Sequence, residues 1–148
     1  MIKMGMMIGD RYEILESIGT GGMSDVYKAK CHKLNRFVAV KVLKQEFSES
    51  AEFVSKFRTE AQAAAGMMHP NIVNVYDVGE ENGTHYIVME LIEGITLKTY
   101  IEKKGQLTFK EAASIAIQVG RGIEAAHNKG IIHRDIKPSN LMLTPVDN

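Results

Sequence analysis

The chain is 148 residues long, which suits one ordinary domain or two small lobes. Apolar residues make up 45% of it, so a sizeable core can form and wholesale disorder is excluded. Eighteen basic residues balance eighteen acidic ones, and this neutrality gives no support to broad binding of nucleic acid or of charged membrane surfaces.

Cysteine content and hydropathy narrow the setting further. Cys31 is the single cysteine, so neither an internal disulfide nor a cysteine metal cluster can form, and a reducing cytoplasm fits. No apolar run approaches the roughly 20 residues of a membrane span. Residues 1–10 are rich in methionine and too short for a secretory signal, so we expect a flexible leader there.

A loosely alternating strand over residues 12–18 leads into a glycine-rich turn at 19–22. Three glycines in four residues suit a tight hairpin whose backbone N–H groups can approach phosphates, with residues 26–30 as the return strand. A dinucleotide-binding motif fits worse, because it needs a helix directly after its glycines. A plain hairpin without a ligand is the alternative.

The next strand, residues 37–43, is apolar except for Lys41. Alternation places Ala39 and Lys41 on the face opposite to the three valines of this strand. The small Ala39 leaves room for a flat ligand beside the ammonium group. The alternative is an edge-strand lysine that points into water.

A helix is predicted over residues 50–65 from its alanine, glutamate, lysine and glutamine content. Glu60 falls near the apolar side that Phe53 and Phe57 define, where an unpaired carboxylate would be costly. Lys41 is the natural partner for it. The alternative is that Glu60 pairs with Arg58 or reaches water.

Strands at 73–78 and 85–91 flank an Asn-Gly turn and complete about five antiparallel strands. Gly94 marks a boundary, so we expect one lobe over residues 11–93 and a second, helical one over 94–148. The second lobe contains a short helix over 96–103 and a long helix behind a capping box, whose Thr108 is the cap and whose Glu111 follows three residues later.

Residues 133–140 read His-Arg-Asp-Ile-Lys-Pro-Ser-Asn. Asp135 can orient a hydroxyl group and accept its proton, Lys137 can neutralise charge on a moving phosphoryl group, and Asn140 can hold a magnesium ion. The alternative for this stretch alone is a polar turn after a helix. The matches upstream, in the right order, decide against that alternative.

Taken together these stretches resemble a eukaryotic-type protein serine/threonine kinase of the bacterial receptor-like group. The resemblance runs from Tyr12 to Leu143 and implies an α+β fold with a five-stranded antiparallel N-lobe, one main helix, and the first helical part of a C-lobe. It rests on the glycine-rich loop, Val38-Ala39-Val40-Lys41, Glu60, His69-Pro70-Asn71, Met89-Glu90 and the loop at 133–140.

By this resemblance the cofactors are ATP and Mg²⁺. Lys41 would hold the α- and β-phosphates with Glu60 keeping it in place, Asp135 would be the catalytic base, Lys137 the γ-phosphate contact, and Asn140 a metal ligand. The remaining nucleotide contacts would come from the phosphate-covering loop and the adenine pocket: Ile18, Gly19, Thr20, Gly21, Gly22, Met23, Ser24, Val26, Ala39, Met89, Glu90, Ile92 and Met142.

Two departures from the family pattern stand out. Ser24 replaces the third glycine of the loop, which is a mild change. The Asp-Phe-Gly motif should follow Asn140 by roughly a dozen residues, whereas the sequence ends at Asn148.

We therefore expect the ATP-binding half, with catalytic loop, of a kinase that phosphorylates serine or threonine in protein substrates, and we expect this half to be inactive alone. A non-catalytic nucleotide-binding or interaction module is the alternative. The apolar stripe of the long helix should lose partners, so we also expect self-association by exchange of C-terminal helices. The expected location is cytoplasmic, with a parent that can be anchored in a membrane.

Overall fold

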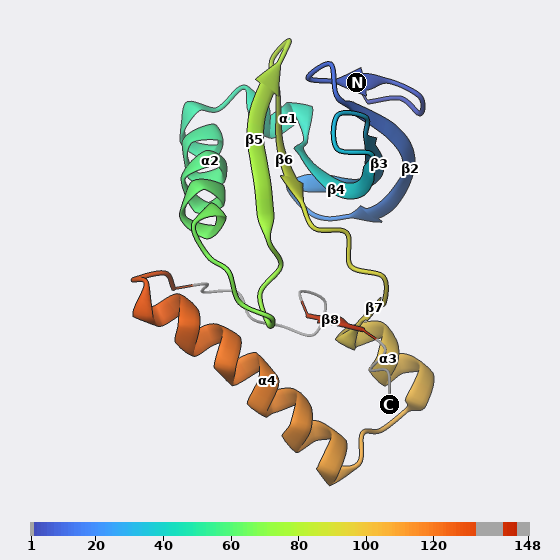
Figure 1. Ribbon diagram of the computed structural model, residues 1–148, viewed down its shortest axis with the longest axis vertical. Helices are drawn as coiled ribbons and strands as arrows, with labels where there is room; N and C mark the ends of the chain where they lie inside the picture. The colour runs from blue at the N-terminus through green and yellow to red at the C-terminus, as the bar shows by residue number, and fades with distance from the viewer. Residues whose placement is uncertain (1, 133–140, 145–148) are drawn as a thin grey trace. The chain divides into compact units, whose positions relative to one another are not determined.

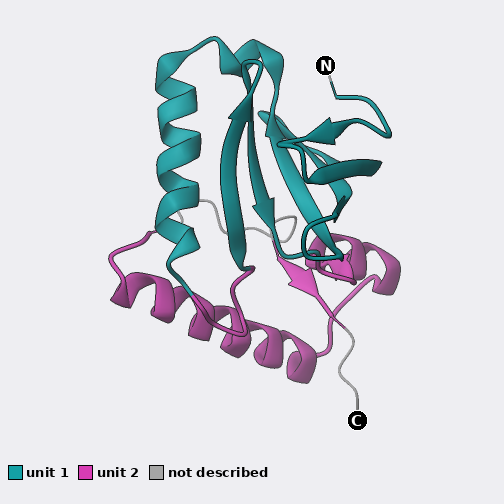
Figure 2. Ribbon diagram, turned by 45° about the horizontal axis from the view of Figure 1, so that its top comes forward, with its two compact units in different colours: residues 1–67, 74–91 teal, residues 68–73, 92–148 magenta. Residues whose placement is uncertain are grey.

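The computed structural model describes residues 2–132 and 141–144, so the loop predicted at 133–140 lies outside the described residues. The chain forms two compact units, one of residues 1–67 and 74–91 and the other of residues 68–73 and 92–148 (Figure 2). The predicted boundary after residue 93 lies close to residue 91, where the chain passes from the first unit to the second for the last time. Residues 68–73, however, belong with the second unit.

The first unit is built on a six-stranded sheet with the order β1-β2-β3-β4-β6-β5, in which every neighbouring pair is antiparallel (Figure 1). The five predicted strands are all present, which confirms the predicted fold class. The six strands are β1 Met7–Ile8, β2 Tyr12–Thr20, β3 Ser24–Cys31, β4 Arg36–Leu43, β5 Val75–Glu81 and β6 Thr84–Met89.

The additional strand, β1, lies in the stretch expected to be a flexible leader. Met7 pairs with Glu13, and Ile8 pairs with Tyr12. Ile8 is 3% exposed and belongs to the core, so its apolar side chain fixes this short strand to the sheet. Two residues are too few for alternation to be detected in the sequence, and the expectation was wrong at this point.

The core of the first unit lies on one face of the sheet. Ile14, Val40 and Val88 are fully buried there, and all three valines of β4 join them as the alternation predicts. The opposite face of β4 is also covered in part, since Ala39 is 5% exposed. β4 is therefore a central strand, since it lies between β3 and β6.

Two helices follow β4. A single helical turn, α1 Gln45–Ser48, had no signal in the sequence, whereas α2 Ala51–Ala65 agrees with the predicted helix within one residue. Phe47 and Phe53 hold the two helices together through an edge-to-face contact with ring centroids 5.2 Å apart. α2 packs alongside β5 (Figure 1).

The second unit contains two helices and a two-stranded ribbon. Strand β7 Ile95–Thr96 pairs with β8 Met142–Leu143, and helix α3 Leu97–Lys104 follows β7 directly. The long helix α4 spans Phe109–Asn128. Gly94 is required beside the ribbon, because a Cβ atom there would collide with the carbonyl oxygen of Leu143.

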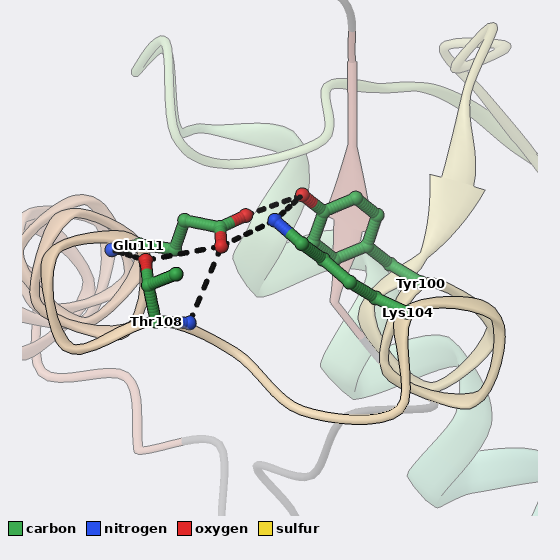
Figure 3. A network of polar contacts seen from close by, with 4 residues as sticks. All are labelled: Tyr100, Lys104, Thr108 and Glu111. Carbon is green, nitrogen blue, oxygen red and sulfur yellow. Dashed lines mark hydrogen bonds and ion pairs between the residues drawn. The ribbon is translucent and has the colours of Figure 1, made fainter.

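The junction of α3 and α4 is fixed by a polar network (Figure 3). Thr108 and Glu111 form the predicted capping box: Glu111 N–H donates to the Thr108 hydroxyl at 3.1 Å, and the Glu111 carboxylate accepts from Thr108 N–H at 3.3 Å. Lys104 forms an ion pair with that carboxylate, and the Tyr100 hydroxyl donates to it. These donors lower the pKa of Glu111 to about 2.

Candidate nucleotide site

The glycine-rich turn joins β2 to β3 as a hairpin, which confirms the predicted strand after the glycines and excludes the dinucleotide-binding alternative. Gly19 pairs with Val26, and Gly21 N–H donates to the Ser24 carbonyl at 2.8 Å. The tip itself is exposed to solvent. It comprises Thr20, Gly21, Gly22 and Met23.

The glycines of this hairpin are not needed for a left-handed backbone, because none of them has a positive φ. A Cβ on Gly22 would meet open space, and one on Gly21 would touch the Ser24 carbonyl at 3.1 Å. Their small size therefore leaves the exposed backbone of the turn open to an approaching ligand.

Lys41 lies in the middle of the sheet. It pairs with Val26 of β3 on one side and with Ile87 of β6 on the other. The alternative of an edge-strand lysine is therefore wrong. The Lys41 side chain is half-buried.

The register of the sheet collects several predicted site residues on one face. Val26 is directly opposite Lys41, and Met89 is directly opposite Ala39, two residues from Lys41 on β4. Since directly opposed residues point to the same face, and residues two apart do so as well, all four share one face of the sheet. Hydrophobic surface thus lies beside the Lys41 ammonium group, next to an exposed glycine-rich turn. Lys28 is directly opposite Ala39 and shares this face, with its ammonium group 4.6 Å from the centroid of the Phe37 ring.

The predicted pair of Lys41 and Glu60 is not formed. Among the residues that the structure describes, the ion pairs within 4.0 Å are His32 with Glu13 and Lys104 with Glu111. Glu60 is exposed on α2. Because α2 packs mainly alongside β5, and β6 lies between β5 and the strand of Lys41, the helix does not bring Glu60 to the lysine.

In the connector after β6, the backbone N–H group of Glu90 is already hydrogen-bonded within the chain. Glu90 N–H donates to the Asn74 carbonyl at 2.8 Å, and the Glu90 side chain accepts from Asn74 N–H at 3.2 Å. The Glu90 amide is therefore occupied, and its carbonyl is the group available for an adenine edge.

The remaining predicted residues are not brought together with these by the first unit. Ile92 and Met142 belong to the second unit, where Met142 lies in β8 opposite Thr96 and is 40% exposed. Asp135, Lys137 and Asn140 lie outside the described residues. Within residues 2–132 and 141–144, no group of three histidine, cysteine or acidic side chains could hold a metal ion.

Sequence reasoning also missed a set of polar residues on the other face of the sheet, centred on Arg11 and Asp77. The Tyr12 hydroxyl donates to Asp77 at 3.0 Å across 65 residues of sequence. No local sequence pattern could have indicated this contact, because it joins side chains of β2 and β5, which are far apart in sequence.

The sheet, the helix after β4 and the glycine-rich hairpin are those of a protein-kinase-like fold. The protein kinase domain family matches residues 12–148, so the chain belongs to the protein kinase family. No described helix has both the length and the apolar character that a membrane crossing requires.

Curated relatives are bacterial serine/threonine kinases. A probable serine/threonine-protein kinase of Clostridium perfringens is 54% identical over 140 residues, which is 95% of this chain and 20% of that protein. Serine/threonine-protein kinase PrkC of Bacillus subtilis is 48% identical over 144 residues, covering 97% and 22%. The chain thus spans about a fifth of the length of these relatives.

Solved structures support the same fold. The kinase domain of Mycobacterium tuberculosis PknI is similar with a TM-score of 0.87 and 29% identity, over 97% of this chain and 59% of that one. The apo form of PpkA-294 is similar with a TM-score of 0.85 and 26% identity, over 97% and 58%.

Proposed function

We propose that this chain is the ATP-binding half of a serine/threonine protein kinase, and that its parent transfers the γ-phosphoryl group of ATP to serine or threonine hydroxyls of protein substrates. The observation that carries the proposal is the placement of Lys41 on one sheet face with Val26, Ala39 and Met89. The serine/threonine kinases among its relatives support the substrate class.

The nucleotide would contact both the glycine-rich turn and the sheet face that carries Lys41. The backbone of the exposed turn at 20–23 would cover the phosphates, and the Lys41 ammonium group would neutralise the α- and β-phosphates. Val26 and Ala39 would contact the adenine ring, with Met142 on its other side and Met89 beside it. The backbone carbonyl of Glu90 would accept from the adenine amino group, and Ile92 would add a backbone contact.

The chemical step would fall to the loop at 133–140. Asp135 would accept the proton of the substrate hydroxyl, Lys137 would contact the γ-phosphate, and Asn140 would hold Mg²⁺. Magnesium would neutralise charge between the phosphates. We propose that Glu60 pairs with Lys41 in the nucleotide-bound parent, which requires α2 to approach β4.

We further propose that the 148 residues alone bind nucleotide without transferring phosphoryl groups. We place the kinase domain of the parent in the cytoplasm, where ATP and protein substrates meet. The motivation is the lack of an Asp-Phe-Gly motif within the sequence, since its aspartate is a main magnesium ligand. Measurable phosphoryl transfer by the purified chain to a generic protein substrate would contradict this.

Nucleotide binding is tested by the unfolding free energy of the chain with and without magnesium-ATP. A ligand at 100 times its dissociation constant stabilises the folded state by about 2.7 kcal/mol. We expect this gain in the wild type and in Lys56→Ala, which removes an exposed lysine of α2, and its loss in Lys41→Ala. An equal gain in Lys41→Ala would overturn the role of Lys41.

Catalysis is tested in a longer chain that contains the whole kinase domain. Lys41→Ala and Asp135→Asn should each abolish transfer to protein serine or threonine, and Lys56→Ala should leave it intact. Undiminished transfer in Asp135→Asn would overturn the role of Asp135. Nucleotide binding combined with no transfer by the longer wild-type chain would favour the alternative, a non-catalytic nucleotide-binding module.

A further inference from the structure

Ser24 is the first residue of β3 and follows the glycine-rich turn directly. It is directly opposite Leu43 of β4, whereas Val26, two residues later, is directly opposite Lys41. This register runs unbroken from Ser24 to the end of β3. Because residues two apart in a strand point to the same face, the Ser24 side chain shares the face of Val26 and Lys41, one step closer to the turn than either.

Burial agrees with this placement of the Ser24 side chain. Ala29 and Cys31 follow Ser24 by an odd number of residues, and both are buried in the core on the other face of the sheet. Ser24 itself is half-buried. Within the described part of the chain its hydroxyl group forms no hydrogen bond. The face that carries the Lys41 ammonium group therefore also carries a hydroxyl group that is available to a ligand.

Two ammonium groups lie on this face at different distances from the turn. Lys28 is directly opposite Ala39, so it lies one step farther from the turn than Lys41 does. Its ammonium group lies 4.6 Å from the centroid of the ring of Phe37, which is 51% exposed and lies another step away from the turn. This cation–π contact directs Lys28 away from Lys41. Lys41 is thus the cation beside the turn, and phosphates that it holds extend towards the turn.

An ATP molecule on this face meets its contacts in a fixed order, a step that rests on the proposed function. The adenine ring lies against Val26 and Ala39, and the α- and β-phosphates lie at Lys41. The next residue of the face towards the turn is Ser24. Diagonal neighbours on adjacent strands are about 7–8 Å apart, a separation that a lysine side chain and a triphosphate chain together can bridge. The terminal phosphate is therefore the part of ATP that reaches Ser24.

We propose that the Ser24 hydroxyl group donates a hydrogen bond to the terminal phosphate of bound ATP and makes the site prefer ATP to ADP. A serine hydroxyl turns its hydrogen towards whichever acceptor is present, and a bond to a charged acceptor is among the stronger hydrogen bonds. A glycine, which the family pattern has at this position, offers no such donor. ADP has no phosphate that reaches Ser24, so the hydroxyl group adds nothing to its binding.

The proposal is tested by calorimetric titration of the 148-residue chain with magnesium-ATP and with magnesium-ADP. The quantity that decides is the ratio of the two dissociation constants. Because a hydrogen bond to a charged group changes a binding constant by about tenfold or more, we expect Ser24→Ala to lower the preference for ATP by about that factor. The affinity for ADP should stay at the wild-type value.

Two further variants separate the hydroxyl group from the backbone of the turn. Ser24→Gly restores the glycine of the family pattern and frees the backbone, but it lacks the hydroxyl group, so it should lose the preference for ATP as Ser24→Ala does. Ser24→Thr keeps a hydroxyl group on a residue type that suits a strand, so it should keep the preference.

Ser17→Ala is the matched control. Ser17 is an exposed residue of β2 that lies directly opposite Tyr27, and Tyr27 packs against the core on the other face of the sheet. Its hydroxyl group is therefore on the face away from Lys41. We expect Ser17→Ala to bind both nucleotides as the wild type does, whereas Lys41→Ala should weaken the binding of both.

The outcomes separate a failure of this proposal from a failure of the proposed function. If the wild type binds neither nucleotide, both are overturned. If Lys41→Ala abolishes binding but Ser24→Ala or Ser24→Gly keeps the wild-type ratio, only the role of Ser24 is overturned. Equal weakening of ATP and ADP in Ser24→Ala would also overturn that role, because the hydroxyl group would then act through Lys41 and not on the terminal phosphate.

Discussion

Tyr12 is a buried side chain, 4% exposed, whose hydroxyl group donates to Asp77. Tyr12→Phe keeps the ring in the core and removes this donor, so we expect the free energy of unfolding in urea to fall by about 1 kcal/mol. Tyr76→Phe is the control, because the Tyr76 ring is 40% exposed. Equal stability of Tyr12→Phe and the wild type would show that water replaces the tyrosine hydroxyl at Asp77 without cost.

Glu111 ties stability to pH. Lys104, Tyr100 and Thr108 donate to its carboxylate and hold its pKa at about 2, below the ordinary value of 4.5. A carboxyl group whose pKa is lower in the folded state contributes stability that is fully present above its ordinary pKa. This contribution is lost as the pH falls from 4.5 towards 2.

Glu111→Gln should therefore reduce the pH dependence of the thermal midpoint. We expect the variant to melt below the wild type at about pH 6 and the difference to shrink by about pH 3. The helical circular dichroism signal reports the midpoint. Glu102→Gln removes an exposed glutamate of α3 and should follow the wild type at both pH values. A difference between Glu111→Gln and the wild type that is constant with pH would contradict the role of the ionised carboxylate.

At the scale of elements, two glycines of α4 give a matched pair. Both gain helix propensity when replaced by alanine, but their surroundings differ. A Cβ on Gly120 would meet nothing within 4 Å, whereas a Cβ on Gly122 would lie 2.9 Å from the Asn71 carbonyl oxygen. Gly122 is thus the point where the segment 68–73 approaches the helix.

We expect Gly120→Ala to raise the free energy of unfolding by about 0.5–1 kcal/mol and Gly122→Ala to lower it by about 1–3 kcal/mol. Urea titrations of both variants and the wild type measure the difference. A gain in both variants would mean that the 68–73 segment yields to the added methyl group without cost.

Elements with a strong local signal were predictable from the sequence. The capping box at Thr108 fixed the start of α4, and helix composition located α2 within a residue. Very short elements, and contacts between residues far apart in sequence, were not predictable. β1 has two residues, α1 has a single turn, and the contact between Tyr12 and Asp77 joins strands far apart in sequence. Such features depend on tertiary packing, which overrides local propensity.

The residues of the candidate site likewise divide into those that a local pattern predicts and those whose position depends on tertiary packing. The face shared by Ala39 and Lys41 follows from alternation alone, because the period of a strand is fixed. The addition of Val26 and Met89 to that face required the register of three strands, which no single segment encodes. Glu60 was placed by helix periodicity on the side expected to meet Lys41, but periodicity does not say which strand a helix packs against. In the structure that strand is β5.

For the whole molecule, the exposed side of α4 leads to an expectation about association. Phe109 is 92% exposed and Ile117 is 55% exposed, and both lie on this helix. Apolar surface of this kind commonly finds a partner. Lys110 and Glu124 lie at equal distances before and after Ile117 in sequence, so two antiparallel α4 helices that cross at Ile117 would place each lysine beside the partner's glutamate.

We therefore expect the chain to form a dimer through α4, with a mass that rises with concentration in light scattering. Ile117→Glu should yield a monomer, whereas Met68→Glu, at a 92% exposed side chain elsewhere in the second unit, should not. Lys110→Glu should weaken the dimer because it places like charges together, and adding Glu124→Lys to it should restore the dimer by exchanging the two charges of the pair.

A dimer that survives Ile117→Glu would instead favour exchange of C-terminal helices between chains, and a monomer at every concentration would contradict association altogether. The charge exchange separates the first two cases, because helices that swap within an otherwise unchanged fold would not respond to the relative signs of Lys110 and Glu124.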